Sequence, residues 1–157
     1  MNVSEVKESI VDRIVQSRDR YIQDLEAMDE SVLQSSPGGA ARIPVDFTYE
    51  VIYVNQRILC RLRGEEPEAF PSDGWITAPL EFQSKSALVT GIRETTDQII
   101  EAWNALPDDG INKKISLPSG ETSPIVMANL CATHLTYHDA QLNYVQSLTG
   151  DNEMHWS

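Results

Sequence analysis

The chain has 157 residues, of which 41% are hydrophobic and 23% are charged. This is the size and composition of one ordinary globular domain, and it excludes a disordered chain. Twelve basic residues stand against 24 acidic ones, for a net charge of −12, so we expect no nucleic-acid or anionic-membrane partner.

No apolar run approaches the roughly 18 residues that a membrane span requires. The first residues, "MNVSEVKESIVDRIVQ", are charged throughout and do not resemble a signal peptide. We therefore expect a cytoplasmic protein.

The 3.6-residue periodicity of amphipathic helices recurs in separate stretches along the chain. Proline in a first turn and glycine just after a last turn mark their ends. The predicted helices are Val3 to Met28, Pro44 to Arg63, Ser84 to Leu106 and Pro124 to Thr149.

The segments between these stretches are predicted loops. Residues 29–42 contain Pro37 and two glycines, and a short extended segment is expected at Lys114 to Leu117. Residues 65–82 are proline-rich, with aromatic side chains available to anchor them. We predict an all-α fold, a four-helix bundle in one domain over residues 1–150 with a tail at 151–157. The long loop between the second and third helices could serve as a crossover, so the topology stays open.

Two of the three histidines, His134 and His138, lie four residues apart in the last helix. This spacing puts both imidazoles on one helical face, the face that carries Cys131, Leu142 and Val145. One interpretation is a pair of core histidines with hydrogen-bond partners. The other is a pair of ligands to one divalent ion, since two neutral imidazoles in a core each need a partner. The glutamate of the HExxH metalloprotease pattern is missing.

A metal site needs at least one more ligand from another helix. Glu50 is the best candidate, because the apolar stripe through Phe47 and Val54 includes it and a buried carboxylate must be paired or bound to a cation. The alternative is a solvated helix edge, with Arg57 or Arg42 as the salt-bridge partner.

The remaining candidates are weaker. Cys131 lies three residues before His134, and it can be a further ligand or a small buried apolar residue. Cys60 and Cys131 form no CxxC motif, and we expect two buried free thiols. His155 is expected at the surface unless Trp156 folds the tail back onto the bundle.

Four features together resemble the DinB/YfiT-like superfamily, which is named after a DNA-damage-inducible protein. They are the helix pattern, "VNQRILCRLRGE", "THLTYHDAQLNYVQSLTGD" and a closing "HW". The resemblance covers most of the chain. It implies a four-helix bundle that holds one metal ion on three histidines, and dimers are common. Some members are S-transferases that use low-molecular-weight thiols such as mycothiol or bacillithiol, and many have no known activity.

Carried over by residue, His134 and His138 match the HxxxH of the last helix. The position that usually holds a histidine in the second helix is Glu50 here, so the implied set is Glu50, His134 and His138. Such a set suits Zn²⁺, and it also resembles the two-histidine, one-carboxylate sites of Fe²⁺, Mn²⁺ or Ni²⁺. Tyr49 and Tyr53 are predicted pocket residues.

Two functions follow as hypotheses. One is a metal-dependent enzyme, a thiol S-transferase or hydrolase that acts on a small molecule, for which the resemblance implies a low-molecular-weight thiol as co-substrate. The other is a non-catalytic homodimeric stress or binding protein whose metal site is degenerate.

Overall fold

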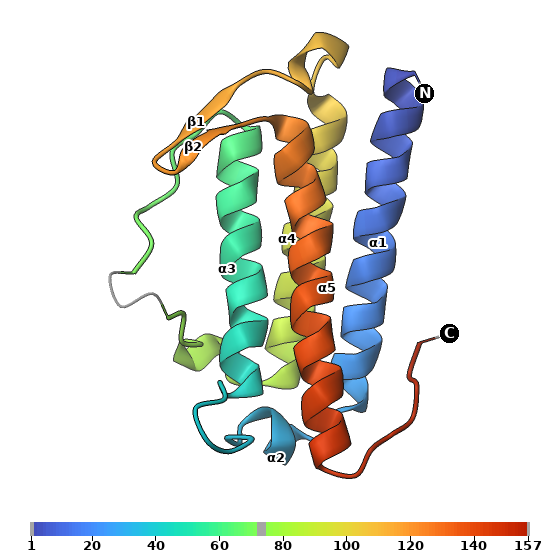
Figure 1. The fold of residues 1–157 in the computed structure, drawn as a ribbon, viewed down its shortest axis with the longest axis vertical. Coiled ribbons are helices and arrows are strands. Elements are labelled where there is room, and N and C mark those ends of the chain that lie inside the picture. Colours follow the sequence, from blue (N-terminus) through green and yellow to red (C-terminus); the bar gives the residue numbers. More distant parts are fainter. Residues whose placement is uncertain (1, 72–74, 157) are drawn as a thin grey trace.

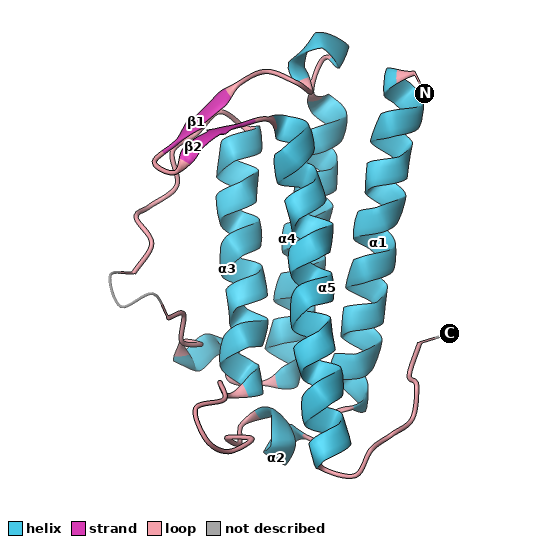
Figure 2. Ribbon diagram, in the orientation of Figure 1, coloured by secondary structure: helices cyan, strands magenta, loops and turns pink. Residues whose placement is uncertain are grey.

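The computed structural model describes residues 2–71 and 75–156. Four long helices within these residues form the predicted bundle (Figures 1 and 2): α1 (Val3–Ala27), α3 (Pro44–Leu62), α4 (Lys85–Ala105) and α5 (Pro124–Leu148). The all-α fold class is confirmed, and each helix lies within two residues of its predicted bounds. None of the described helices is long and apolar enough to cross a membrane.

Local sequence explains where these helices begin and end. Asn2 and Glu5 form a reciprocal capping box at the start of α1. Pro44 and Pro124 occupy first turns, where a missing N–H costs nothing. Gly64 follows α3 with a φ of 76°, a left-handed conformation that side-chain-bearing residues rarely adopt.

The loop after α3 is a crossover. Figure 1 shows the chain leaving α3 at one end of the bundle and returning along its side, so that α4 starts at the opposite end and runs parallel to α3. The connection includes the 3-10 turn η1 (Leu80–Phe82), while residues 72–74 of the predicted loop lie outside the described residues. The helices α1 and α5 are also parallel, and α5 packs between α1 and α3.

Four smaller elements within the described residues complete the fold. The 29–42 segment contains a short helix that the sequence analysis did not predict, α2 (Glu30–Leu33). A 3-10 turn, η2 (Asp108–Gly110), follows α4. The predicted extended segment is the strand β1 (Ile115–Leu117), which pairs antiparallel with β2 (Gly120–Thr122).

The core runs the length of the bundle and is apolar, with Trp103, Tyr21 and Ile14 among its largest fully buried side chains. At one point α3 and α4 approach so closely that a Cβ on Gly91 would lie 2.7 Å from Ile52 Cδ1. Glycine at this position therefore sets the packing of the two helices that flank the crossover.

Candidate metal centre

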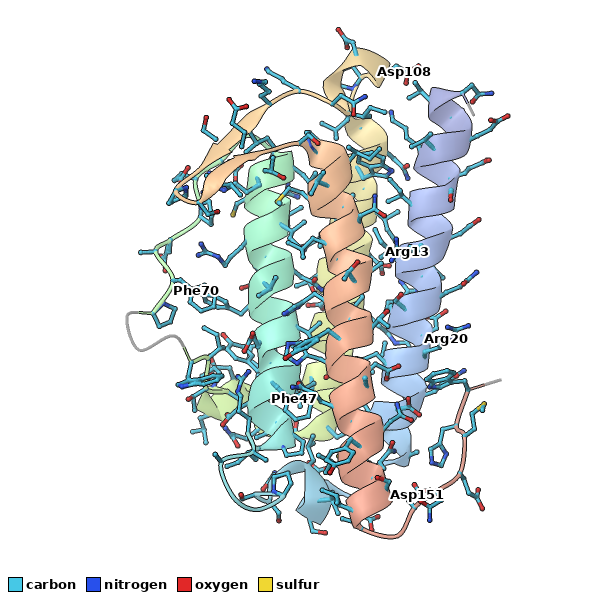
Figure 3. The ribbon with its side chains drawn as sticks, viewed as in Figure 1. Arg13, Arg20, Phe47, Phe70, Asp108 and Asp151 are labelled. Carbon is cyan, nitrogen blue, oxygen red and sulfur yellow. The ribbon has the colours of Figure 1, made fainter. Side chains whose placement is uncertain are left out.

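Glu50 of α3 and the two histidines of α5 meet inside the bundle. His134 Nε2 lies 3.0 Å from His138 Nε2, and Glu50 Oε1 lies 3.8 and 3.7 Å from these two atoms respectively. Figure 3 labels Phe47, near the start of α3, whose ring stacks on His138 at a centroid distance of 5.7 Å. Adjacent packing of α3 and α5 brings together residues that are 84 positions apart in the chain.

These three atoms could hold a metal ion. The point equidistant from three atoms separated by 3.0, 3.7 and 3.8 Å lies about 2 Å from each, and zinc bonds to histidine nitrogen and carboxylate oxygen are about 2.0–2.2 Å long. The donor set therefore fits a transition-metal ion in both chemistry and size.

Gln141 sets the protonation of His138. Its Oε1 lies 2.7 Å from His138 Nδ1, and because an amide oxygen only accepts, Nδ1 must carry the proton. The lone pair of His138 is then on Nε2, the atom that faces Glu50 and His134. This is the usual arrangement of a metal-binding histidine and the residue that orients it.

The hydrogen bonds of His134 differ from those of His138. Its Nδ1 is buried and has no hydrogen-bond partner among the described residues. Because His138 Nε2 is an acceptor, the 3.0 Å contact requires His134 to donate from Nε2. An ion at this point would take the place of that proton, which would then belong on Nδ1.

Arg42 neutralises the carboxylate of Glu50. Its Nη1 donates to Glu50 Oε2, the oxygen that faces away from the imidazoles, and its Nη2 donates to Ile76 O at 2.9 Å. The guanidinium also lies over the Trp75 ring, 5.0 Å from its centroid. Arg42 thus fixes Glu50 and ties the end of the crossover loop to the site.

Glu50 and His134 keep their ligand forms at neutral pH. Burial raises the pKa of Glu50, but the two imidazoles and the guanidinium beside it outweigh burial and hold that pKa well below its ordinary value. Burial lowers the pKa of His134, and this outweighs the opposing effect of the Glu50 carboxylate. An anionic Glu50 and a neutral His134 are the forms that bind a metal.

The site opens into a cleft of about 860 Å³. Its walls are the 37–42 loop, Trp75, the start of α3 and the C-terminal half of α5, and Glu50 and His138 lie at its floor. We call it the α5 cleft. The ring of Tyr137 meets His138 edge-on at its entrance, at a centroid distance of 4.9 Å.

The structure resolves several alternatives left by the sequence. Glu50 pairs with Arg42 and also faces the two histidines, so it is both a salt-bridge partner and a candidate metal ligand. His138 is buried as expected, whereas His134 is half-buried. Cys131 stays outside the donor group, because its thiol contacts Asn55 Oδ1 at 3.4 Å.

The placement of two tyrosines in the pocket was wrong. Tyr49 packs against Phe82, and Tyr53 packs edge-on against Phe70; neither lines the α5 cleft. Both side chains neighbour Glu50 in sequence but leave α3 in other directions, toward the crossover loop. The cysteines are free as predicted, although Cys60 is only half-buried.

Sequence reasoning also missed a second polar cluster, between α1 and α5. Asp24 and Asp139 are both buried, and burial together with the Asp24 carboxylate raises the pKa of Asp139 to about 8. The tail folds back, as one alternative allowed, so that Trp156 Nε1 donates to Asp24 Oδ2 at 2.5 Å. Figure 3 shows the tail returning from Asp151 toward Arg20, whose guanidinium lies over the Trp156 ring.

The fold and the site define a helical-bundle protein with a group of side chains able to hold one metal ion. Among solved structures, the chain is similar to a conserved protein from Enterococcus faecalis, with a TM-score of 0.69 and 12% identity over 94% of this chain and 97% of the other. It is also similar to a DinB-like protein, YjoA, from Bacillus subtilis, with a TM-score of 0.65 and 12% identity over 94% and 96%. These likenesses show a DinB-like fold. No family model and no curated protein matches the sequence.

Proposed function

We propose that Glu50, His134 and His138 bind one divalent transition metal, and that the protein is a metal-dependent enzyme acting on a small molecule. The observation that carries the proposal is the donor triangle, with sides of 3.0, 3.7 and 3.8 Å. Two imidazoles and one carboxylate suit Zn²⁺ with an open coordination position, and they also suit Fe²⁺, Mn²⁺ or Ni²⁺.

A bound ion would supply a Lewis acid that lowers the pKa of a thiol or a water at the floor of the α5 cleft. Neighbouring side chains orient the candidate ligands. Gln141 keeps the His138 lone pair directed at the site, and Arg42 holds the outer oxygen of Glu50 so that the inner one faces the imidazoles. The reaction class that we propose, thiol-dependent S-transfer or hydrolysis, rests on the resemblance to DinB-like proteins, as does a low-molecular-weight thiol as co-substrate.

One observation favours a second candidate, a non-catalytic dimeric stress or binding protein with a degenerate site. Each residue of the donor group already has a partner within the chain: Arg42 pairs with Glu50 through Oε2, and the two imidazoles hydrogen-bond each other. The group can therefore persist without an ion. The two candidates differ in whether the protein acquires and keeps a metal.

Metal analysis of protein purified without added metal separates them. For the enzyme we expect close to one equivalent of a transition metal per chain, as a three-ligand site implies, and loss of most of it in His134→Ala. His155→Ala is the matched control, because His155 lies in the tail and bonds Asp151. Less than about a tenth of an equivalent in the wild type, with no gain in thermal stability when Zn²⁺ is added, would favour the non-catalytic protein.

A further inference from the structure

The α5 cleft exposes an unusual amount of apolar surface. Of the ten large hydrophobic side chains that are exposed among the described residues, four line this cleft: Trp75, Tyr137, Tyr144 and Leu148. Each is more than half exposed, at 63%, 60%, 67% and 56%. Clustered exposed hydrophobic residues mark a binding surface, whereas single ones do not.

The shape of the cleft suits a small molecule. Its volume of about 860 Å³ lies within the range of roughly 300–1,000 Å³ that is typical of ligand pockets. The polar groups converge at the floor, where Arg42, Glu50, His138 and Gln141 lie, and the outer walls are apolar. Three of the four exposed wall residues are aromatic, so they offer flat faces on which a ring can stack.

The charge at the floor of the cleft determines which polar group of a ligand can bind there. Arg42 and Glu50 form an ion pair, so their charges cancel, and an imidazole that binds a metal is neutral. A divalent ion on the donor group would therefore bring the floor to a net charge of about +2. On a chain whose overall charge is −12, this is a local positive site at the end of an apolar cleft.

We propose that the α5 cleft binds a small molecule made of an apolar aromatic ring system with one anionic group. The rings lie against Trp75, Tyr137 and Tyr144, and the anion lies at the floor beside Arg42. The ring half of this inference stands on the cleft alone, and the anionic half rests on the proposed metal site. The guanidinium retains donors beyond the two that bond Glu50 and Ile76 O.

Two fluorescent probes test the ring half and the anionic half of this proposal separately. The first, 8-anilinonaphthalene-1-sulfonate, combines aromatic rings with one negative charge, and N-phenyl-1-naphthylamine has the same rings without the charge. We expect both to bind the purified full chain at one site. Adding Zn²⁺ should tighten binding of the sulfonate roughly tenfold, as one charge-assisted contact would, and should leave the uncharged probe unchanged.

Three variants locate the site. Ala140→Trp fills the cleft from an exposed position on α5 and should weaken both probes at least tenfold while Zn²⁺ binding persists. Ala27→Trp, at an exposed position at the end of α1, is the matched control and should change neither probe. Arg42→Gln should weaken the sulfonate but not the uncharged probe.

Failure of this inference is distinguishable from failure of the proposed metal site. If the wild type binds no Zn²⁺ but Ala140→Trp still abolishes probe binding, the metal site fails and the apolar cleft stands. If Ala140→Trp leaves both probes bound, the cleft is not their site and the inference is overturned. Light scattering gives a further test: a wild-type dimer that Ala140→Trp converts to a monomer would assign the cleft to a second copy of the chain, which would also overturn it.

Discussion

Replacing Glu50 with glutamine is the most direct test of the candidate metal centre. The amide has the same shape as the carboxylate but no charge, so the packing of α3 against α5 is kept. Without a metal, the variant loses the ion pair between Glu50 and Arg42. In the wild type the Arg42 side chain is 20% exposed and the Glu50 side chain is 17% exposed. Breaking a pair that is mostly buried should cost more than the about 1 kcal/mol of an exposed pair and less than the roughly 3–5 kcal/mol of a fully buried one. Because a domain is stable by about 5–15 kcal/mol, the metal-free variant should remain folded.

The expected magnitude follows from linkage between metal binding and folding. At a free Zn²⁺ concentration 100 times the dissociation constant, binding stabilises the folded state by about 2.7 kcal/mol. For a chain of this size each kcal/mol shifts the melting temperature by about 2–4 °C, so the wild type should gain about 5–11 °C. Loss of a direct ligand should weaken binding at least as much as the 10–100-fold seen when a supporting residue is lost. At the same Zn²⁺ concentration the variant then gains about 3–6 °C if binding is tenfold weaker, and about 1–2 °C if it is a hundredfold weaker.

The assay is a thermal melt, followed by circular dichroism, with and without Zn²⁺. Glu94→Gln is the matched control, because Glu94 is exposed on α4 and belongs to no donor group within the described residues; it should show the wild-type gain. If Glu50→Gln also keeps the wild-type gain, the carboxylate is only the partner of Arg42 and the three-ligand site is refuted.

Three further predictions concern the same bundle. Glu50→His, which places the usual DinB-like residue in the site, should keep the stabilisation by Zn²⁺ and lose that by Mn²⁺ in the same melts, because Mn²⁺ prefers carboxylate to imidazole; equal loss of both would contradict this. The folded-state pKa of Asp139, about 8, lies above its ordinary value of 3.8, so the unfolded state releases its proton first and the free energy of unfolding should fall from about pH 4 to about pH 8. Asp139→Asn should flatten this dependence of the free energy of unfolding on pH, as measured by urea titrations at several pH values. An unchanged dependence would assign it to other titratable groups. Trp156→Phe removes one of the two hydrogen bonds that Asp24 Oδ2 accepts, the other being from Asn143, and should cost about 0.5–1.5 kcal/mol in the same titrations; no loss would mean that the tail does not stay docked in solution.

The bundle could be predicted because its signals are local. Periodicity fixed the four long helices, while first-turn prolines and the glycine after α3 marked their ends. The donor group was predictable in part for the same reason. The spacing of His134 and His138 places them on one face whatever the fold. The position of Glu50 on an apolar stripe made it the best candidate for a third ligand, and the resemblance added support.

The rest depended on contacts between distant parts of the chain. Nothing near Arg42 in sequence indicates that its guanidinium also reaches the carbonyl of Ile76 in the crossover loop. The pairing of Asp24 with Trp156 joins the first helix to the tail, 132 positions apart. Gln141 is different: it lies three residues after His138 on the same helix, and that spacing could have identified it as the residue that orients the imidazole.

The presence of Arg42 explains how a carboxylate is tolerated at position 50, inside the bundle. A histidine at position 50 would be neutral and would need no counter-charge, whereas a half-buried carboxylate is costly unless it is paired. Arg42 supplies the pairing through the outer oxygen and leaves the inner oxygen for the donor triangle. The same guanidinium lies in the wall of the α5 cleft. The carboxylate at position 50 therefore requires a second charged group, and that group connects the candidate metal centre to the surface where a ligand would bind.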